Sequence, residues 1–298
     1  MSTVLLTGGS GLIGSQLSKK LKEKGYDVFI LSRTRDNKQD IPTYFWNPEK
    51  MEIEKKAIEA ADYIIHLAGT NIGEKRWTAK RKKEIIESRV ETAKLIFDSV
   101  KKNNKNIKAF ISASAIGYYG AITSDKIFTE ADLPYDDFLG NTCLQWEQSA
   151  DKFQELGIRT VKIRTGIVIT KSGGVLSRLL APAKLGIGSP LGNGKQYMPW
   201  IHIDDLCDIY IKALEDDSMS GAYNAVAPIH ITNKEFSRSV SHTLHKPFWF
   251  PSIPAFILKL IFGNMSVMIL EGSRVSCKKI VQSGYNFHFP NLEQALTD

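Results

Sequence analysis

The chain has 298 residues, of which 43% are hydrophobic and 24% charged, and its formal net charge is +7 at pH 7. These fractions are ordinary for a globular protein, and a chain of this length buries roughly three quarters of its unfolded surface. The size suits one α/β unit or a nucleotide-binding domain with a smaller companion. The lysine runs look like solvated helix faces and no arginine–aromatic array is present, so we expect no nucleic-acid partner.

The cysteines restrict the class of protein further. Cys143, Cys207 and Cys277 are odd in number, lie far apart and form no C-x-x-C pair. This spacing argues against a zinc ribbon and a disulfide framework, and it favours a reducing compartment. Because the first predicted strand begins directly after Met1, we expect no signal peptide and a cytoplasmic location.

One long apolar stretch, residues 253–270, needs its own interpretation. Lys259, Gly263 and Asn264 interrupt it. A membrane span needs about 20 consecutive, predominantly apolar residues. We therefore predict two packed helical pieces at this place, and no membrane partner.

The chain begins with the pattern of a nucleotide-binding turn. Val4 to Leu6 is an apolar run suited to a buried strand, and an amphipathic helix ending at Gly25 follows the turn. Glycines let the backbone approach a pyrophosphate, and the helix N-terminus offers that anion N–H groups and a positive dipole end. The strand–turn–helix context predicts dinucleotide binding. The predicted cofactor-binding residues here are Thr7, Gly8, Gly9, Ser10, Gly11, Leu12, Ile13 and Gly14.

The next apolar strand, Val28 to Leu31, indicates which dinucleotide binds. A site for NAD usually has Asp or Glu at the end of this strand, where it binds the ribose 2′-hydroxyl. This chain has Ser32 and Arg33 there, with Arg35 close by. A guanidinium favours a 2′-phosphate through its charge and its forked hydrogen bonds. The sequence therefore predicts NADP(H) in preference to NAD(H).

Strands and helices then alternate up to about residue 170. The pattern predicts strands at 44–46, 63–67, 110–114 and 160–169, and helices at 53–61, 78–102 and 138–156. Such alternation predicts an α/β protein with a Rossmann-type, doubly wound parallel sheet, whose ligands bind at the carboxyl ends of the strands. We place the NADP(H)-binding domain at 1–170, with a returning segment near 197–226. Residues 171–298 are predicted to form mainly a smaller C-terminal substrate lobe.

Four motifs follow one another in the chain: the Thr7–Gly14 turn, His66-Leu-Ala-Gly69, Ser112-Ala-Ser114 and Trp200-Ile-His-Ile-Asp-Asp-Leu206. Together they resemble the extended short-chain dehydrogenase/reductases, the superfamily of the nucleotide-sugar epimerases and dehydratases. Within it the chain resembles the little-characterised branch called "epimerase family protein". Supporting segments lie at 73–78, 88–90, 115–120, 192–194 and 198–200.

The resemblance covers nearly the whole chain, and several expectations follow from it. It implies a Rossmann fold with Leu67, Ala68 and Gly69 beside the cofactor. It also implies a small C-terminal domain of unknown function at about 248–298. Dimers through the two long helices, 78–102 and 138–156, are common in the superfamily, so a homodimer is expected here.

The resemblance also implies a chemistry from which this chain departs. The superfamily moves a hydride between carbon and nicotinamide, while a tyrosine moves the proton and a serine polarises the substrate oxygen. A lysine one helical turn after the tyrosine lowers its pKa from about 10. Ser114 matches the serine, but Cys143 stands where the tyrosine belongs and Glu147 where the lysine belongs. Because a glutamate raises the pKa of a neighbouring phenol or thiol, the standard mechanism cannot be carried over.

Three substitutes for the missing proton donor are chemically possible. Tyr118 or Tyr119, from the loop after Ser114, could reach the substrate oxygen. Glu147 could act as an acid or base if partial burial lifts its pKa from about 4.3, and Cys143 could donate from a thiol with a pKa of about 8.5. We rank the loop tyrosines first, then Glu147, then Cys143. For each residue alone, ordinary packing or solvation is the competing interpretation.

Four further residues are candidate substrate contacts. Arg76 and Trp77 follow the branch's pattern in the loop after the 63–67 strand, where they could bind an anionic or ring-shaped substrate. The resemblance places Lys195 and Gln196 where extended members contact the nucleotide of the substrate. We predict no metal site, since the candidate pair has no third ligand; that pair is His242 and His245.

The segment around residue 204 has a structural interpretation instead. Asp204 and Asp205 precede an apolar helix that starts at Leu206. Helix capping explains at least one of the two acids. His202 lies in an alternating strand and is expected to be a structural histidine.

Two functions remain open at the level of the sequence. The first is an enzyme: an NADP(H)-binding oxidoreductase or epimerase for a small hydroxyl or carbonyl substrate, for which a nucleotide sugar is one candidate. The second is a non-catalytic NADP(H)-binding redox sensor or regulatory protein, which the missing Tyr-x-x-x-Lys pair favours. The match at Ser114 favours the enzyme.

Overall fold

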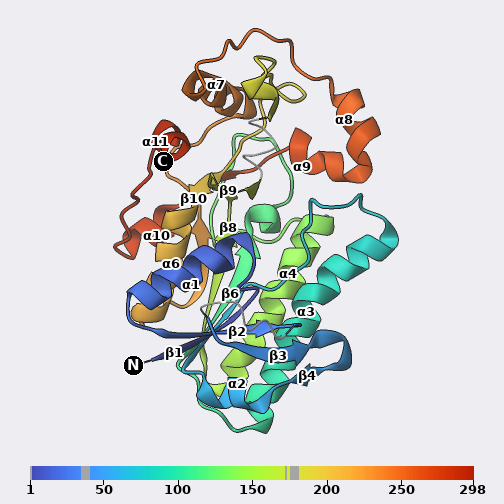
Figure 1. Ribbon diagram of the computed structural model, residues 1–298. Coiled ribbons are helices and arrows are strands. Elements are labelled where there is room, and N and C mark those ends of the chain that lie inside the picture. Colours follow the sequence, from blue (N-terminus) through green and yellow to red (C-terminus); the bar gives the residue numbers. More distant parts are fainter. Residues whose placement is uncertain (1, 35–40, 172, 175–180) are drawn as a thin grey trace.

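The computed structural model describes residues 2–34, 41–171, 173–174 and 181–298. Figure 1 shows a central sheet with helices on both faces and a helical lobe above the carboxyl ends of its strands. The lobe includes α7 (Asn233–Thr243), α8 (Ala255–Phe262) and α9 (Val267–Leu270). The predicted architecture, a doubly wound sheet with a smaller C-terminal part, is confirmed.

The sheet has eight strands. They are β1 (Thr3–Thr7), β2 (Asp27–Ser32), β3 (Thr43–Asn47), β4 (Glu52–Ile53), β5 (Tyr63–His66), β6 (Ala109–Ala115), β8 (Arg159–Thr165) and β11 (Gly221–Ala225). Their order is β11–β8–β6–β5–β1–β2–β3–β4. Neighbouring strands pair in parallel, except for the antiparallel pair of β3 and β4. The chain therefore moves outward from β1 in both directions, which places the glycine turn after β1 at the centre of the carboxyl edge.

Alternation along each strand divides the core between the two faces of the sheet. Val4 and Leu6 of β1 share a buried cluster with side chains of α1 (Leu12–Glu23), α6 (Ile203–Glu215) and α10 (Lys278–Gln282). Leu5, between them, belongs to the cluster on the other face with α2 (Lys55–Ala60), α3 (Ala79–Lys102) and α4 (Phe138–Asp151). Both faces of the central strands are thus covered, which explains why these strands read as continuous apolar runs.

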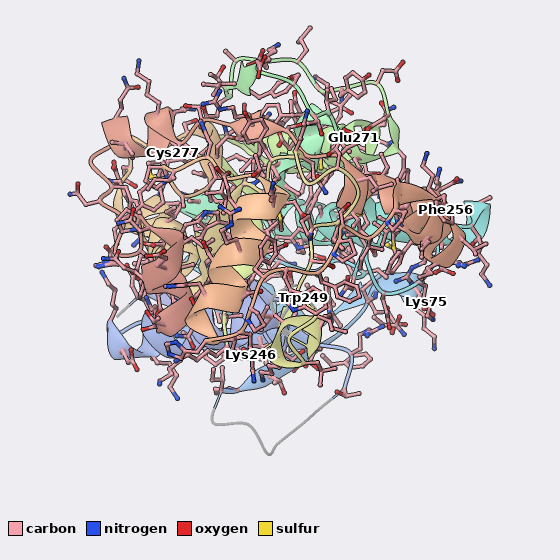
Figure 2. All side chains as sticks on the ribbon, turned by 90° about the horizontal axis from the view of Figure 1, so that it is seen from above. Lys75, Lys246, Trp249, Phe256, Glu271 and Cys277 are labelled. Atoms are coloured by element: carbon pink, nitrogen blue, oxygen red, sulfur yellow. The ribbon has the colours of Figure 1, made fainter. Side chains whose placement is uncertain are left out.

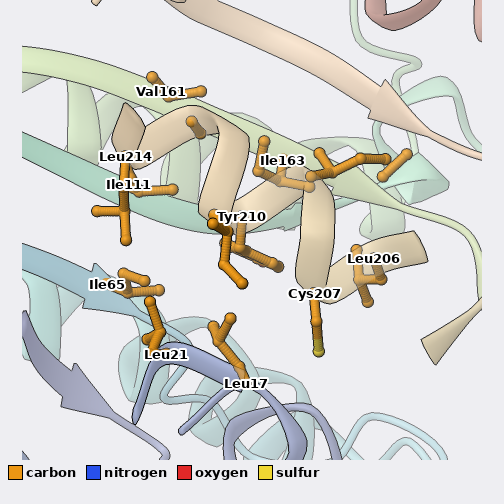
Figure 3. Close-up of a cluster of buried hydrophobic side chains, with 14 of the residues drawn as sticks. Leu17, Leu21, Ile65, Ile111, Val161, Ile163, Leu206, Cys207, Tyr210 and Leu214 are labelled. Atoms are coloured by element: carbon orange, nitrogen blue, oxygen red, sulfur yellow. The ribbon is translucent and has the colours of Figure 1, made fainter. Parts of the chain in front are cut away.

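The first of these clusters is drawn in Figure 3. Leu17 and Leu21, one helical turn apart on α1, point toward Ile65 of β5 and Tyr210 of α6. All four side chains are fully buried. Burying an aliphatic side chain of this size stabilises a fold by about 1.5–3 kcal/mol. The packing fixes α1 on the sheet, and with it the position of the turn at its N-terminus.

Side-chain caps fix the residues at which the two long helices begin. Thr78 accepts a hydrogen bond from the Arg81 N–H at the start of α3, and Asp137 accepts one from the Gly140 N–H at the start of α4. The predicted helix 138–156 is divided in two, because α4 ends at Asp151 and a 3₁₀ segment, η3 (Lys152–Leu156), continues it. Gly157, with φ of 73°, ends that segment in the left-handed region, as its sequence position predicts.

The predicted strand 160–169 is wrong in one respect. It is divided at Gly166 into β8 and β9 (Ile167–Ile169), and β9 leaves the sheet to pair with β10 (Trp200–His202). A Cβ atom at Gly166 would lie 2.7 Å from the Pro199 carbonyl oxygen, so the glycine admits the incoming strand. This break directs the chain out of the Rossmann sheet and into the lobe.

The lobe and the sheet are joined by the last part of the chain. The apolar stretch 253–270 forms two helices, α8 and α9, linked by the 3₁₀ segment η4 (Gly263–Ser266), as predicted. Among the described residues, no helix combines the length and the apolarity that crossing a bilayer requires. The chain then returns to the sheet domain, where β12 (Arg274–Val275) pairs with β7 (Ile127–Phe128), before α11 (Leu292–Thr297) packs against α7.

The prediction that an aspartate caps α6 is also wrong. His202 is the N-cap residue, and its Nδ1 accepts a hydrogen bond from the Asp204 N–H at 3.3 Å. Asp205 is fully buried, and its carboxylate accepts from the Tyr285 hydroxyl at 2.7 Å. It also accepts from two backbone N–H groups, at 2.8 Å and 3.0 Å, those of His288 and Phe289. Asp205 therefore clamps the C-terminal segment to the start of α6.

Candidate cofactor and active site

The predicted glycine turn joins β1 to α1 at the carboxyl edge of the sheet. Gly8 has a φ of 69°, and its carbonyl oxygen accepts a hydrogen bond from the Gly11 N–H at 3.0 Å. A Cβ atom at Gly14 would lie 2.3 Å from that oxygen, so a side chain there would force the turn apart. Gly11 is the N-cap of α1, and within the described residues no side chain caps this helix or adds an acid to its first turn. The N–H groups and the positive dipole end of α1 thus remain available to an anion.

A second predicted segment lies directly beside this turn. Thr7 Oγ1 accepts hydrogen bonds from the N–H groups of Leu67 and Ala68, at 3.1 Å and 3.0 Å. A Cβ atom at Gly8 would lie 3.0 Å from the Leu67 carbonyl carbon, so the two loops touch. Gly69 completes the segment, and its Cβ position is 3.1 Å from the guanidinium carbon of Arg89. The structure therefore brings the Thr7–Gly14 turn and the Leu67–Gly69 loop together.

The end of β2 is the third part of this region. The Ser32 hydroxyl accepts a hydrogen bond from the Thr34 N–H at 3.2 Å, which shapes the turn after the strand. The Arg33 side chain is exposed there. Arg35 lies outside the described residues. The glycine turn, the open helix end and the adjacent end of β2 fit a dinucleotide, whose pyrophosphate the glycine turn would hold.

A buried polar network lies where the resemblance places the catalytic residues. The Ser114 hydroxyl donates to Glu147 Oε1 at 2.7 Å. Arg164, near the end of β8, binds both oxygens of the same carboxylate, with Nε at 2.8 Å from Oε1 and Nη2 at 2.9 Å from Oε2. Burial lowers the pKa of Arg164, but the hydrogen bonds and charge of Glu147 outweigh that effect and raise it. The pair is therefore a buried, forked ion pair.

A second ion pair also joins α4 to β8. Lys162, two residues before Arg164, binds Asp151, four residues after Glu147, with Nζ at 2.6 Å from Oδ1. Two residues of strand span about 6.6 Å and four residues of helix about 6 Å, so the spacings match. The earlier strand residue pairs with the later helix residue, because the strand and the helix run in opposite directions. Two basic residues two positions apart on the strand thus meet two acids four positions apart on the helix.

The two loop tyrosines, on η2 (Ile116–Tyr119), differ in their contacts. The Tyr119 hydroxyl accepts from Arg164 Nη1 at 2.9 Å and donates to Asn224 Oδ1 at 2.7 Å. The Tyr118 ring lies closer to Arg164, with its centroid 3.5 Å from the guanidinium carbon, and its hydroxyl interacts with the same guanidinium. Burial raises the pKa of both phenols, and the charge of Arg164 offsets this only in part. Both tyrosines therefore hold their protons at neutral pH.

The thiol at the tyrosine position is a weak acid. Cys143 is 5% exposed and packs with Tyr118, Tyr119 and Val226. Burial and then the negative charge of Glu147 raise the pKa of its thiol to about 12. Cys143 is thus almost fully in its thiol form at neutral pH. Glu147, the other predicted proton donor on α4, is bound by Arg164.

The predicted substrate contacts make bonds within the protein. Arg76 donates from Nη2 to the Leu260 carbonyl at 2.7 Å and from Nε to the Ile261 carbonyl at 2.9 Å, which are near the end of α8. Trp77 is 8% exposed and its ring packs edge-on against Phe138, with centroids 4.8 Å apart. Their role toward a substrate stays a prediction.

The other predicted pair lies in the lobe. Lys195 is exposed. Gln196 is 2% exposed and donates from Nε2 to the carbonyls of Leu191 and Ile269, at 3.0 Å and 2.7 Å. Its Oε1 is buried without a hydrogen-bond partner among the described residues. Gln196 therefore holds α9 to the loop before β10, and its contact with a substrate stays a prediction.

Among the described residues, His202, Asp204 and Asp298 come closest to the arrangement of metal ligands. Their bonding is already accounted for, because His202 Nδ1 accepts from a backbone N–H and its Nε2 faces Asp298 Oδ2 at 3.5 Å. Lys20 Nζ lies 3.1 Å from Asp204 Oδ1 and supplies a cation there. These contacts favour a helix-capping role over metal binding.

Arg164 is the site residue that sequence reasoning missed. It lies in the segment Thr160–Ile169, which reads as a strand although Lys162 and Arg164 interrupt its apolar residues. The signal was available, because a buried arginine requires an acidic partner. Glu147, on the helix before that strand, was already singled out for another role.

Comparison with known proteins finds similar sequences over the whole chain. Residues 4–225 match the NAD dependent epimerase/dehydratase family, and residues 253–298 match a domain of unknown function, DUF1731. An epimerase family protein of Staphylococcus aureus (strain NCTC 8325) is 35% identical over 302 residues, covering 100% of this chain and 99% of that protein.

Solved structures are similar as well. The human epimerase family protein SDR39U1 (isoform 2), solved with NADPH, is 32% identical with a TM-score of 0.88, covering 99% of this chain and 97% of that one. The nucleoside-diphosphate sugar epimerase of Corynebacterium glutamicum is 29% identical with a TM-score of 0.82, covering 99% of this chain and 57% of that one.

Proposed function

Since the chain belongs to the NAD dependent epimerase/dehydratase family, we propose that it is an NADP(H)-binding oxidoreductase or epimerase acting on a hydroxyl or carbonyl compound. The observation that carries this proposal is the glycine turn, where a Cβ atom at Gly14 would lie 2.3 Å from the Gly8 carbonyl oxygen. A turn this close to the helix start is the geometry that a pyrophosphate requires. A nucleotide sugar is one candidate substrate.

The preference for NADP(H) rests on Arg33. It stands at the end of β2 where an NAD site usually has an acid, and its side chain is exposed. A guanidinium there attracts a 2′-phosphate and offers it two parallel donors. The similar human protein was solved with NADPH, which supports the same preference here.

We propose that Tyr118 is the group that donates a proton to the substrate oxygen. When bound, NADP(H) supplies or accepts the hydride. Arg164 and Asn224 both bind the Tyr119 hydroxyl, whereas Arg164 contacts Tyr118 through its ring as well as its hydroxyl. Because burial raises the pKa of Tyr118, the phenol is protonated at neutral pH, which suits donation of its proton to a substrate oxygen. The cation over the ring stabilises the phenolate that donation leaves behind.

A second function is favoured by one specific observation. The Ser114 hydroxyl donates a hydrogen bond to Glu147 Oε1 at 2.7 Å. That bond must break before Ser114 can donate to a substrate oxygen, and Glu147 is held by Arg164. A cofactor-binding protein that senses the ratio of NADP⁺ to NADPH and transfers no hydride has no need of that donation. It is our second candidate.

The test of cofactor choice is titration of the cofactor-stripped protein by calorimetry. Arg33→Ala should weaken NADPH binding by about 10- to 100-fold and leave NADH within about twofold, because it removes a charged, forked hydrogen bond to the phosphate. Lys19→Ala is the matched control, since it removes one positive charge from a side chain that is 72% exposed on the outer face of α1. Equal losses for both cofactors in Arg33→Ala would contradict the preference.

The enzyme and the sensor differ in a second experiment. With a panel of carbonyl compounds, the enzyme should oxidise NADPH, and Tyr118→Phe should lower the rate by about 10²- to 10⁴-fold without changing NADPH affinity. Tyr135→Phe, at a ring that is 48% exposed, should leave the rate unchanged. A protein that binds both cofactor forms, changes conformation between them and oxidises no NADPH with any compound would be the sensor.

A further inference from the structure

An exposed apolar surface covers part of the C-terminal lobe. Trp249 is 68% exposed, and Phe256 and Leu260, one turn apart on the same side of α8, are 70% and 77% exposed. Phe250 and Ile261, at 40% and 51%, extend the surface along the chain. We call these five residues the lobe patch. Large apolar side chains exposed in one segment are a mark of an interaction surface.

The charges within the segment that carries the lobe patch, between Glu235 and Glu271, are of one sign. Residues 236–270 contain no Asp or Glu, although the chain has 32 of them among its 298 residues. The same segment contains Arg238, Lys246 and Lys259, and all three side chains are exposed. Within the described part of the chain, neither Lys246 nor Lys259 forms an ion pair. An apolar patch set in a purely basic segment is complementary to an apolar surface that carries negative charge.

The segment lies across one side of the molecule. Figure 2 looks down on the lobe, where Lys246, Trp249 and Phe256 mark its course over the surface, and Figure 1 shows α8 at the outer edge of the lobe. Arg76 binds carbonyl groups near the end of α8, so the helix is folded and fixed in place before any partner arrives. Its outer face is therefore presented in a defined orientation.

We propose that the lobe patch binds an anionic lipid surface, with α8 lying in the plane of that surface. Aromatic rings with a polar edge, such as that of Trp249, favour the boundary between lipid headgroups and acyl chains. Lys246 and Lys259 reach the headgroups while their stems cover apolar surface. At eight residues, α8 is about 12 Å long, so it lies on a bilayer and does not cross it. The absence of a membrane span in the sequence is thus compatible with peripheral binding.

The experiment uses the full chain and vesicles of two compositions. Vesicles of phosphatidylcholine with about 30% phosphatidylglycerol should bind the protein, and vesicles of phosphatidylcholine alone should bind it at least tenfold less. Raising the salt to roughly 0.5 M should release it, because screening shortens the reach of the charges. The double variant Phe256→Ser/Leu260→Ser should lose at least tenfold in partitioning, and Lys246→Glu/Lys259→Glu should lose binding to the anionic vesicles.

Two controls separate this surface from the rest of the protein. Leu133→Ser removes a side chain that is 83% exposed outside the lobe patch, so it should bind vesicles like the wild type. NADPH affinity and melting temperature should be unchanged in every variant, because these side chains are exposed and distant in sequence from the glycine turn. Failure to bind either vesicle, or equal binding to both, would overturn the proposal and leave the cofactor proposal intact. A wild-type dimer by light scattering that Phe256→Ser/Leu260→Ser converts to a monomer would also overturn it, since a second copy would then cover the patch.

Discussion

At the scale of single residues, His66 is held in one protonation state by its neighbours. It is fully buried below the glycine turn, with Nδ1 at 2.8 Å from Thr7 Oγ1 and Nε2 at 3.2 Å from Thr92 Oγ1. Because Thr7 Oγ1 already accepts two backbone hydrogen bonds, its own proton points to Nδ1, which leaves the proton of the ring on Nε2. Thr92 Oγ1 accepts a hydrogen bond from the Nε2–H group, and its own hydroxyl donates to the Ser88 carbonyl oxygen at 2.8 Å. The imidazole is therefore neutral.

This network predicts a pH dependence of stability. Burial lowers the pKa of His66 from 6.5 to about 4. Between those values the unfolded chain takes up a proton that the folded protein does not, so the free energy of unfolding falls as the pH falls. The loss should begin near pH 6.5 and reach about 3 kcal/mol by pH 4. Urea unfolding between pH 7 and about pH 4.5 measures it.

The control for that series is His66→Gln. It removes the titrating group, so its free energy of unfolding should fall less steeply with pH than that of the wild type, whatever the other histidines and carboxyl groups contribute. Parallel curves for the two proteins would show that His66 does not titrate as its burial requires.

At the scale of elements, the turn between β1 and α1 makes a sharp prediction. Alanine is favoured over glycine in a helix by about 1 kcal/mol, yet a Cβ atom at Gly14 would lie 2.3 Å from the Gly8 oxygen. Overpacking of this kind costs about 1–3 kcal/mol, so the clash outweighs the helix preference. Gly14→Ala should lower the melting temperature and weaken NADPH binding more than tenfold, as calorimetry would measure. Ser15→Ala, at the next, exposed position, should change neither, and normal NADPH binding by Gly14→Ala would show that the turn can open.

The elements also show what sequence periodicity can and cannot predict. The helix α3 and the strands β1, β2 and β5 lie within two residues of their predicted bounds, because apolar spacing and caps determine them locally. The division of 160–169 at Gly166 was missed, since the residues on both sides of the glycine have strand-forming sequences. Nothing in that local pattern shows that the second part pairs with a strand outside the main sheet. The cap of α6 was missed for a different reason: Asp205 has the preferred chemistry for a cap, but partners at 285–289 bind it instead.

At the scale of the whole molecule, the same distinction applies to the candidate site. The glycine turn and the Leu67–Gly69 loop were predictable, because each is a local motif at a strand end. Ser114 and Glu147 were predicted from the resemblance, but their hydrogen bond was not. The bonds of Arg164 to Glu147 and Tyr119 join β8, α4 and η2, which meet only after the sheet has formed. The sequence indicates that a buried arginine needs an acidic partner, but it does not identify which acid that partner is.

The contacts of Asp205 with residues 285–289 also bear on the order of folding during synthesis. Its partners, the Tyr285 hydroxyl and the His288 and Phe289 N–H groups, follow it by 80, 83 and 84 residues. At a translation rate of about 5–20 residues per second, roughly 4–16 s pass between the appearance of Asp205 and that of the groups that bind it. During that interval its carboxylate must stay hydrated, so the start of α6 cannot dock in its final form. We therefore expect that helix α6 takes its final position on the sheet only after residues 285–289 have been synthesised.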